Sequence, residues 1–221
     1  MSRPGPVSPD LKLQGRRLVR ALNRLFPEPA CALDHRNPFE LLAATVLSAQ
    51  CTDARVNLVT PALFARFPGP ESLAVADLAD VETLIHATGF FRAKARNLVA
   101  MAEALVEHHG SQVPRDLEAL TALPGVGRKT ANVVLGTAFG IASGVVVDTH
   151  VKRLTYRLGL TISTNPIVIE RELINILPKT QWIGFSHRLI LHGRQTCVAL
   201  HPRCDACALA SICPRIGVSG S

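Results

Sequence analysis

Four of the six cysteines lie within the last 25 residues, spaced as Cys197-x6-Cys204-x2-Cys207-x5-Cys213. Four thiolates this close in sequence can hold one soft metal centre, either a [4Fe–4S] cluster or a tetrahedral zinc ion. Structural zinc sites usually pair their cysteines in two C-x2–4-C knuckles, and only Cys204 and Cys207 form such a pair here. The spacing therefore predicts a metal centre, and it favours an iron–sulfur cluster over zinc and over two disulfides.

The composition indicates a protein of a reducing compartment. No apolar signal segment stands at the N-terminus, so Cys31 and Cys51 are expected to be reduced core thiols. No run of about 18 uncharged apolar residues is present, so no membrane span and no membrane partner are expected. We expect a cytoplasmic, nucleoid-associated protein of a prokaryote that works as a monomer.

A formal net charge of +7 and a pI near 9.5 indicate a polyanionic partner. The positive residues are spread through segments expected to be helical, as in Arg92–Arg96, Arg128–Lys129 and Lys152–Arg153. Positive charge on folded elements suits a surface that follows a phosphate backbone. The alternative is a set of solvated helix faces, and charge alone does not decide between the two.

Capping signals and apolar periodicity predict a helix in nearly every segment. Leu11, Leu18, Leu22 and Leu25 form one stripe of an N-terminal amphipathic helix. Further helices are expected at 39–49, 53–67, 78–89, 91–109, 116–123, 128–139, 149–158, 167–177 and 180–197. The β-like run 145–147 is too short to build a sheet. The predicted fold class is therefore all-α.

The segment Leu123–Ala131 reads Leu-Pro-Gly-Val-Gly-Arg-Lys-Thr-Ala and predicts two helices joined by a glycine hairpin. Pro124 ends the first helix, and Gly125 and Gly127 allow a tight turn with close backbone approach. Backbone N–H groups at the start of the second helix can hold a phosphate without reading a base. A nucleotide-binding P-loop would need a preceding strand and a longer spacing between its glycines, and both are missing here. The other alternative is a simple corner between two helices.

Taken together, the hairpin segment Leu123–Asn132, the segment Val147–Val151 (Val-Asp-Thr-His-Val) and the cysteine loop resemble the endonuclease III family of DNA base-excision glycosylases. The segment Leu47–Asp53 (Leu-Ser-Ala-Gln-Cys-Thr-Asp) is similar to that family too, and the match runs from about residue 16 to 214. The resemblance implies the helix-hairpin-helix glycosylase fold and double-stranded DNA with damaged bases or abasic sites as partner. It also implies that the four cysteines hold a [4Fe–4S] cluster.

The same resemblance implies two helical domains with DNA in the cleft between them. Residues 32–143 are expected to form a six-helix barrel that contains the helix-hairpin-helix at about 116–140. Residues 10–31 and 144–214 are expected to form the iron–sulfur domain. The ends, 1–9 and 215–221, are expected to be flexible.

The resemblance gives Lys129 and Asp148 the catalytic roles. A neutral amine can attack carbon, so Lys129 suits Schiff-base chemistry at C1′ of the damaged nucleotide. Asp148 can stabilise positive charge near C1′ and help move the lysine proton. The simpler alternatives are a phosphate contact for Lys129 and a helix N-cap for Asp148.

The resemblance also implies a set of DNA-contacting residues. If the damaged base is flipped out of the duplex, Gln50 would fill the gap that it leaves in the base stack. Phe90 would act as a wedge between bases on the opposing side, although it could instead be a core residue. The full set is Gln50, Phe90, Gly125, Val126, Gly127, Arg128, Thr130, His150 and Arg203.

The predicted function is therefore a bifunctional DNA glycosylase and AP lyase that removes oxidised pyrimidines. An adenine glycosylase would need a glutamate where Ala43, Ala44 and Thr45 stand, and both it and a monofunctional mismatch glycosylase lack the lysine. A ferredoxin-like carrier would be smaller and acidic, with tighter cysteine spacing. A non-catalytic iron–sulfur DNA-binding protein remains open.

Overall fold

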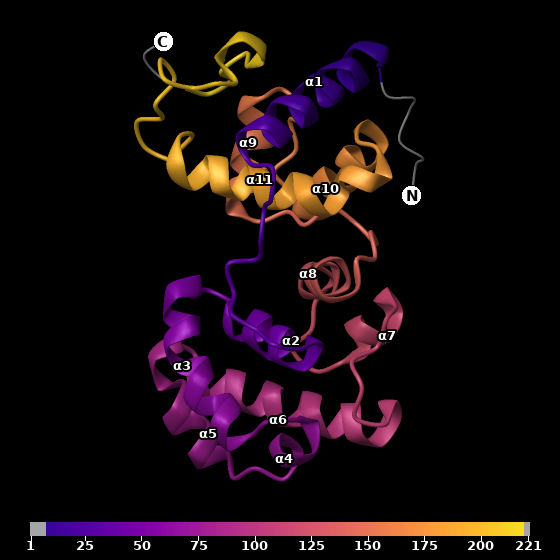
Figure 1. Ribbon diagram of the computed structural model, residues 1–221, viewed down its shortest axis with the longest axis vertical. Coiled ribbons are helices and arrows are strands. Elements are labelled where there is room, and N and C mark those ends of the chain that lie inside the picture. The colour runs from indigo at the N-terminus through magenta and orange to yellow at the C-terminus, as the bar shows by residue number, and fades with distance from the viewer. Residues whose placement is uncertain (1–7, 219–221) are drawn as a thin grey trace. The chain divides into compact units, whose positions relative to one another are not determined.

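All regular structure within residues 8–218, the part of the chain that the computed structural model describes, is helical (Figure 1). This confirms the all-α prediction. Within the same range, no helix combines the length and the apolar character needed to cross a bilayer. The chain divides into two compact units, which we call unit 1 (residues 1–30 and 144–221) and unit 2 (residues 31–143).

Unit 2 is a bundle of helices between Pro38 and Phe139. Its helices are α2 (Pro38–Leu47), α3 (Asp53–Arg66), α4 (Pro70–Ala74), α5 (Leu78–Ile85), the 3-10 turn η1 (His86–Thr88), α6 (Phe91–His109), α7 (Leu117–Ala122) and α8 (Arg128–Phe139). The sequence predicted all of these α-helices except α4, and it expected one helix over 78–89 where the structure has α5 followed by η1. Helix α4 is only five residues long, too short for an apolar period to show.

Unit 1 combines the N-terminal helix with the C-terminal part of the chain. Its elements are α1 (Pro9–Leu25), α9 (Thr149–Arg157), α10 (Pro166–Ile176), the 3-10 turn η2 (Lys179–Gln181), α11 (Trp182–Gln195) and the 3-10 turn η3 (Ala210–Ile212). The helix expected from about residue 180 therefore starts as a 3-10 turn. Of the ends expected to be flexible, residues 1–7 and 219–221 lie outside the described residues. Ser8 caps α1, and the N–H of Ile216 donates to the carbonyl of Arg157.

Helix starts follow the local capping chemistry that the sequence carries. The Asn37 side chain accepts from the N–H of Glu40 at 2.9 Å, and Pro38 takes the first helical position of α2. Asn165 and Pro166 begin α10 in the same way. A side-chain acceptor at the N-cap satisfies an N–H that has no partner inside the helix, so these starts are fixed locally.

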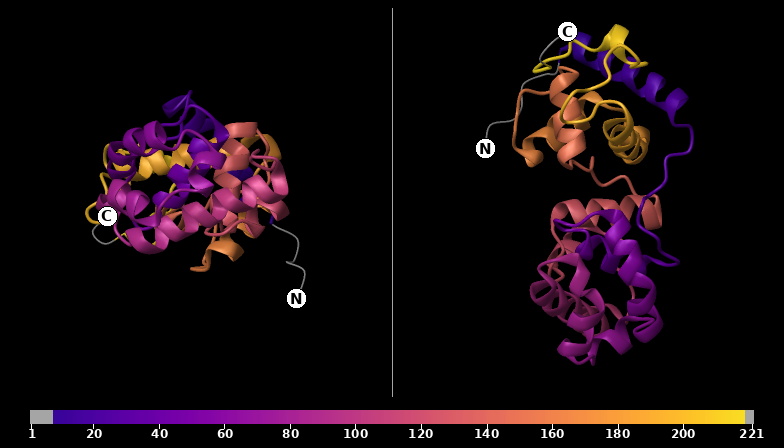
Figure 2. Two further views of the ribbon diagram at one scale, coloured as in Figure 1. Left: turned by 90° about the horizontal axis from the view of Figure 1, so that it is seen from below. Right: turned by 90° about the vertical axis from the view of Figure 1, so that its left-hand side faces the viewer.

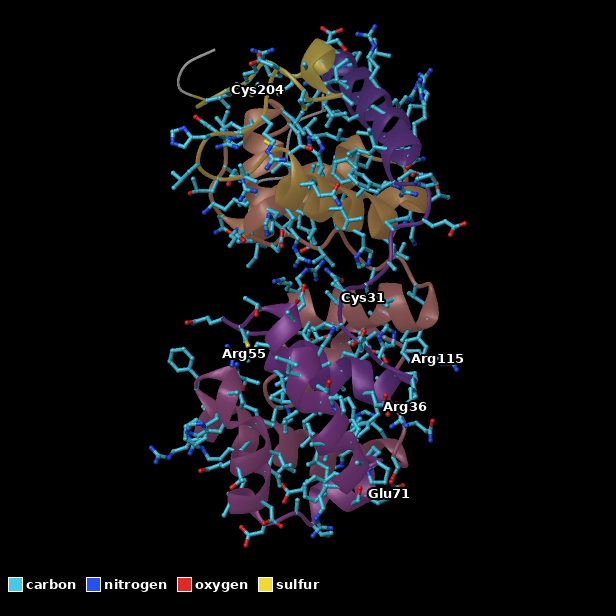
Figure 3. The ribbon with its side chains drawn as sticks, turned by 60° about the vertical axis from the view of Figure 1, so that its left-hand side comes forward. Cys31, Arg36, Arg55, Glu71, Arg115 and Cys204 are labelled. Carbon is cyan, nitrogen blue, oxygen red and sulfur yellow. The ribbon has the colours of Figure 1, made fainter. Side chains whose placement is uncertain are left out.

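The core of unit 2 forms around α2, which is buried on every side from Phe39 to Leu47. Its one charged residue, Glu40, is 2% exposed and accepts from the backbone and the guanidinium of Arg36 (Arg36 is labelled in Figure 3). Because a buried carboxylate needs a partner, this ion pair permits a charge on an otherwise apolar helix. Helices α6 and α8 both pack on α2, so its burial positions the hairpin that precedes α8.

In unit 1, α1 packs against α10 and α11 (Figures 1 and 2). Leu18 and Leu22 of the predicted stripe are completely buried, whereas Leu25 is 38% exposed. Gly15 faces α10 so closely that a Cβ at this position would lie 2.6 Å from Cγ2 of Ile176. Glycine at this point of α1 therefore sets how closely the two helices approach.

Replacing Gly15 with alanine should destabilise unit 1, although alanine usually favours a helix. We expect the overpacked contact to outweigh the propensity gain and to lower the free energy of unfolding by about 1–3 kcal/mol. The fluorescence of Trp182, the single tryptophan of the chain and part of unit 1, can follow urea denaturation of the variant. A variant as stable as the wild type would show that α1 does not pack in this way.

Candidate functional site

The glycine hairpin of unit 2 has a conformation that only glycine adopts without strain at position 125. Gly125 has φ of +74°, and a Cβ there would lie 2.8 Å from Cβ of Asn97 on α6. The N–H of Val126 donates to the carbonyl of Leu123 at 3.1 Å, and the Val126 side chain is buried. The amide of Val126 is therefore used inside the turn, and its side chain anchors the hairpin to the core.

Helix α8 starts directly after this hairpin and presents charged side chains at its first turn. Gly127 is the N-cap in an extended conformation, and a Cβ at Gly127 would meet nothing within 4 Å. Arg128 and Lys129 are exposed, and Thr130 is half-buried. The opposite face of α8 is fixed in the core through Ala131 and other buried residues. The start of α8 thus combines the positive end of the helix dipole with an open backbone position and two cationic side chains.

Gln50 and Phe90 are exposed residues that both adopt the left-handed backbone conformation. Gln50 has φ of +51° just after α2, and Phe90 has φ of +48° at the start of α6. The Phe90 side chain is 68% exposed, so the alternative that it belongs to the core is wrong. Such strain in non-glycine residues persists only where the surroundings hold it, and it is concentrated at functional sites.

Asp148 is the N-cap of α9 in unit 1, as the simpler interpretation predicted. Its Oδ1 accepts from the N–H of Val151 at 2.8 Å, and its side chain is half-buried. The amide and the positive end of the helix hold this carboxylate in place. Capping therefore leaves a carboxylate at a defined position, and it does not compete with a role in catalysis.

His150 and Arg153 lie together one turn into α9. Nη2 of Arg153 is 3.1 Å from Nδ1 of His150 and donates to the carbonyl of Gly193 on α11 at 3.0 Å. Burial lowers the pKa of His150; Asp148 acts in the opposite direction, and Arg153 and Arg194 lower the pKa further. The imidazole is therefore held mostly neutral near pH 7, in contact with a guanidinium.

The four C-terminal cysteines all line one small cavity of unit 1. Cys197 follows α11, and the remaining three come from the loop that contains η3; Cys204 is labelled in Figure 3. Within the described part of the chain, no group of three or more His, Cys, Asp or Glu side chains is arranged to hold a metal ion.

Two arginines of α9 hold the beginning of the cysteine loop. Arg157, which is 8% exposed, donates to the Val198 carbonyl at 2.7 Å and to the Ala199 carbonyl at 2.9 Å, and its Nη1 is 3.4 Å from Sγ of Cys197. Arg153 donates to the Cys197 carbonyl at 2.9 Å. These bonds satisfy loop carbonyls that have no secondary-structure partner, so α9 fixes the path of the loop.

The surroundings of the cavity disfavour the charged form of two of its thiols, Cys207 and Cys213. Burial raises the pKa of both Cys207 and Cys213, and the neighbouring thiolates raise them further. Nε2 of the buried His192 lies 3.5 Å from Sγ of Cys207, and burial lowers the pKa of this histidine. Four neighbouring thiolates repel one another unless positive charge lies between them. The four cysteines therefore fit a positively charged metal centre in the cavity.

Sequence reasoning placed the candidate residues but missed the side chains that support them. Arg153, Arg157 and His192 were not singled out. One signal existed for Arg157, because it lies three residues after the buried Leu154 and therefore on the same face of α9. His192 had no comparable signal, since only the folded loop brings Cys207 to it.

The candidate residues are divided between the two units. Unit 2 contains Gln50, Phe90, the hairpin and Lys129, whereas unit 1 contains Asp148, His150, Arg203 and the four cysteines. Arg203 is exposed, and its N–H donates to the Thr196 carbonyl at 3.0 Å. Cys31 and Cys51, expected as core thiols, are half-buried against the core of unit 2.

Comparison with known proteins identifies the family. The model of HhH-GPD superfamily base excision DNA repair proteins matches residues 43–179. Endonuclease III of Synechocystis sp. is 52% identical over 203 residues, which cover 92% of this chain and 93% of that protein. Endonuclease III of Escherichia coli K12 is 42% identical over 196 residues, covering 89% and 92%.

Solved structures agree with these sequence matches. A non-covalent endonuclease III–DNA complex superposes with a TM-score of 0.88 at 44% identity, covering 92% of this chain and 95% of that one. A trapped endonuclease III–DNA covalent intermediate gives a TM-score of 0.87 at 43% identity, covering 92% and 96%. Hairpin, helix order and cysteine loop together place this chain in the endonuclease III family of the HhH-GPD superfamily.

Proposed function

We propose that this protein is a bifunctional DNA glycosylase and AP lyase of base excision repair that removes oxidised pyrimidines. The observation that carries the proposal is the exposed amine of Lys129 at the start of α8, directly after the hairpin. A solved relative of 43% identity is a covalent intermediate with DNA, and a lysine amine is the group that forms such a bond with a sugar carbon. The exposed lysine disfavours a monofunctional glycosylase and a non-catalytic DNA-binding protein.

The proposed reaction needs one amine and one carboxylate. The neutral amine of Lys129 attacks C1′, the glycosidic bond breaks, and the base leaves with the bonding electrons. The sugar ring opens to an imine, a proton is lost from C2′, and the C3′–O bond breaks to release the 3′ phosphate. Water then hydrolyses the imine and frees the lysine. Asp148 would stabilise positive charge at the sugar and receive the lysine proton.

DNA binding is proposed for the hairpin and for the two strained, exposed residues. Backbone amides at the start of α8, with Arg128 and Thr130, offer a site for a backbone phosphate. The open space at Gly127 supports close approach of such a phosphate. We assign Gln50 to the vacated position in the stack and Phe90 to the opposing wedge; their exposure supports both roles. His150 and Arg203 would add contacts from unit 1.

The four cysteines are proposed to hold a [4Fe–4S] cluster. Their shared cavity supports one common metal centre, and the cysteine spacing favours a cluster over a single zinc ion. Bound through four thiolates, the cluster would cross-link the loop that contains Arg203. The bonds from Arg153 and Arg157 orient the start of that loop through groups of the chain itself.

The domain boundaries are proposed to lie near residues 31 and 144. These boundaries are supported by the contacts within the chain, which group residues Cys31–Ser143 into one compact unit. Unit 2 would supply the nucleophile and the residues that open the duplex, and unit 1 the carboxylate and the metal-bearing loop.

Replacing Lys129 with alanine should abolish the covalent intermediate. On a duplex with an oxidised pyrimidine, borohydride should trap a protein–DNA adduct with the wild type and none with Lys129→Ala, because no other group is proposed to form the imine. Lys12→Ala, which removes an exposed lysine of α1, is the matched control and should trap normally. Trapping that persists in Lys129→Ala would contradict the assignment.

Asp148 can be tested separately as a cap and as a carboxylate. Asparagine caps helices about as well as aspartate, so Asp148→Asn should keep the stability while single-turnover cleavage slows by roughly a hundredfold. Asp148→Ala removes the cap as well and should cost about 1 kcal/mol of stability. Unfolding curves and single-turnover rates measure the two effects. If the asparagine variant cleaved at the wild-type rate, the capping role alone would stand.

The two hairpin glycines should respond differently to alanine. Gly125→Ala should destabilise the protein by about 1–3 kcal/mol, because φ is positive and Asn97 lies in the way. Gly127→Ala should leave the stability unchanged but weaken DNA binding by about 1 kcal/mol, through loss of close phosphate approach. Thermal unfolding and binding titrations at one fixed salt concentration separate these effects. Unchanged DNA affinity in Gly127→Ala would argue against the phosphate site.

A further inference from the structure

Unit 2 contains one lysine that is buried rather than solvated. Lys94 of α6 is 5% exposed, and its Nζ donates to the backbone carbonyl of Thr88 at 2.8 Å. Burial lowers the pKa of this ammonium group. Buried lysines are rare because a charge loses its hydration, and an apolar side chain would fill the same space at less electrostatic cost. The position of this ammonium therefore calls for a reason beyond packing.

Lys94 holds the turn that presents Phe90. Besides the bond from Nζ to Thr88, the backbone N–H of Lys94 donates to the carbonyl of Phe90 at 3.1 Å. The turn contains two successive residues of positive φ, Gly89 at +68° and Phe90 at +48°. The hydroxyl of Thr88 donates to the carbonyl of Ile85 at 2.8 Å, which fixes the turn to α5. Lys94 thus bonds to this turn at Thr88 and at Phe90, whose aromatic ring is exposed.

Gln50 is the other exposed non-glycine residue of positive φ in unit 2, and it follows α2. Helix α2 packs against α6, the helix that contains Lys94. Helix α6 thus contacts the helix that precedes Gln50, and through Lys94 it holds the turn that carries Phe90.

We propose that Lys94 is a positioning residue for base extrusion: through Thr88, its ammonium fixes the turn that carries Phe90. The inference rests on the proposed function, because only a protein that extrudes a base from the duplex needs a wedge held in a fixed position. Lys94 touches neither DNA nor the reacting atoms. Its effect passes through the Phe90 ring, which must be rigid to part stacked bases.

The test compares substrates that do and do not need the duplex to be opened. Lys94→Met keeps the length and volume of the side chain and removes only the hydrogen-bonding ammonium. Two duplexes carry the same oxidised pyrimidine next to 2-aminopurine, one fully paired and one with the lesion in an unpaired bulge. Stopped-flow fluorescence of 2-aminopurine reports unstacking, and single-turnover cleavage reports the chemistry. Lys12→Met, an exposed lysine of α1, is the control.

A positioning role predicts a selective defect. In Lys94→Met, unstacking and cleavage of the paired duplex should slow by roughly tenfold, whereas cleavage of the bulged duplex should change less than about twofold. Phe90→Ala should show the same pattern. Because both residues act through one turn, the double variant Lys94→Met/Phe90→Ala should be no slower than Phe90→Ala alone. Lys12→Met should match the wild type on both substrates.

Other outcomes overturn the inference. Equal slowing on paired and bulged duplexes would indicate a merely structural role, since a loss of folded protein reduces both rates alike. Losses that multiply in the double variant would show that Lys94 does not act through Phe90. Wild-type behaviour of Lys94→Met would also contradict the inference while leaving the proposed function intact. A wild type that neither cleaves nor traps would overturn the proposed function itself, and with it this inference.

Discussion

The backbone at Gly125 is the constraint on which the arrangement of unit 2 depends. Its φ is positive, and a Cβ at this position would lie only 2.8 Å from Cβ of Asn97, so only glycine fits there. The turn that follows buries Val126 and lets α8 begin at Arg128. A shift of one residue in this start would rotate Lys129 by about 100° around the helix axis. The place of the proposed nucleophile is therefore set by backbone sterics.

Helix α9 has the corresponding role in unit 1. Its first residue follows the capping carboxylate of Asp148, and its last turn contains Arg157, which holds the carbonyls of the cysteine loop. A single rigid helix of nine residues thus fixes both the proposed carboxylate and the path of the loop. The proposed chemistry belongs to an amine and a carboxylate, neither of which lines the cavity of the four cysteines.

The sequence predicted the parts of this structure that depend on local chemistry. Caps such as Asn37 with Pro38 fix helix starts within a few residues, and α6 runs from Phe91 to His109 as expected. The left-handed backbone at Phe90 has no such local signature, because non-glycine residues adopt it only when their surroundings impose it. The burial of Arg157 likewise depends on the carbonyls of Val198 and Ala199, which are far away until the chain folds. Lys94 bonds to the nearby carbonyl of Thr88, but only the folded turn brings the two together. Sequence reasoning therefore found the candidate reactive residues but not the cations that hold their segments.

The most direct test of the central claim is to locate the covalent bond. Wild-type protein would be trapped with borohydride on a duplex containing an oxidised pyrimidine, digested with protease, and analysed by tandem mass spectrometry for the peptide that carries the reduced sugar adduct. We expect a single adduct on Nζ of Lys129, in the peptide that contains the hairpin and the first turn of α8. An adduct on Lys152, on the N-terminal amine or on any other residue would contradict it.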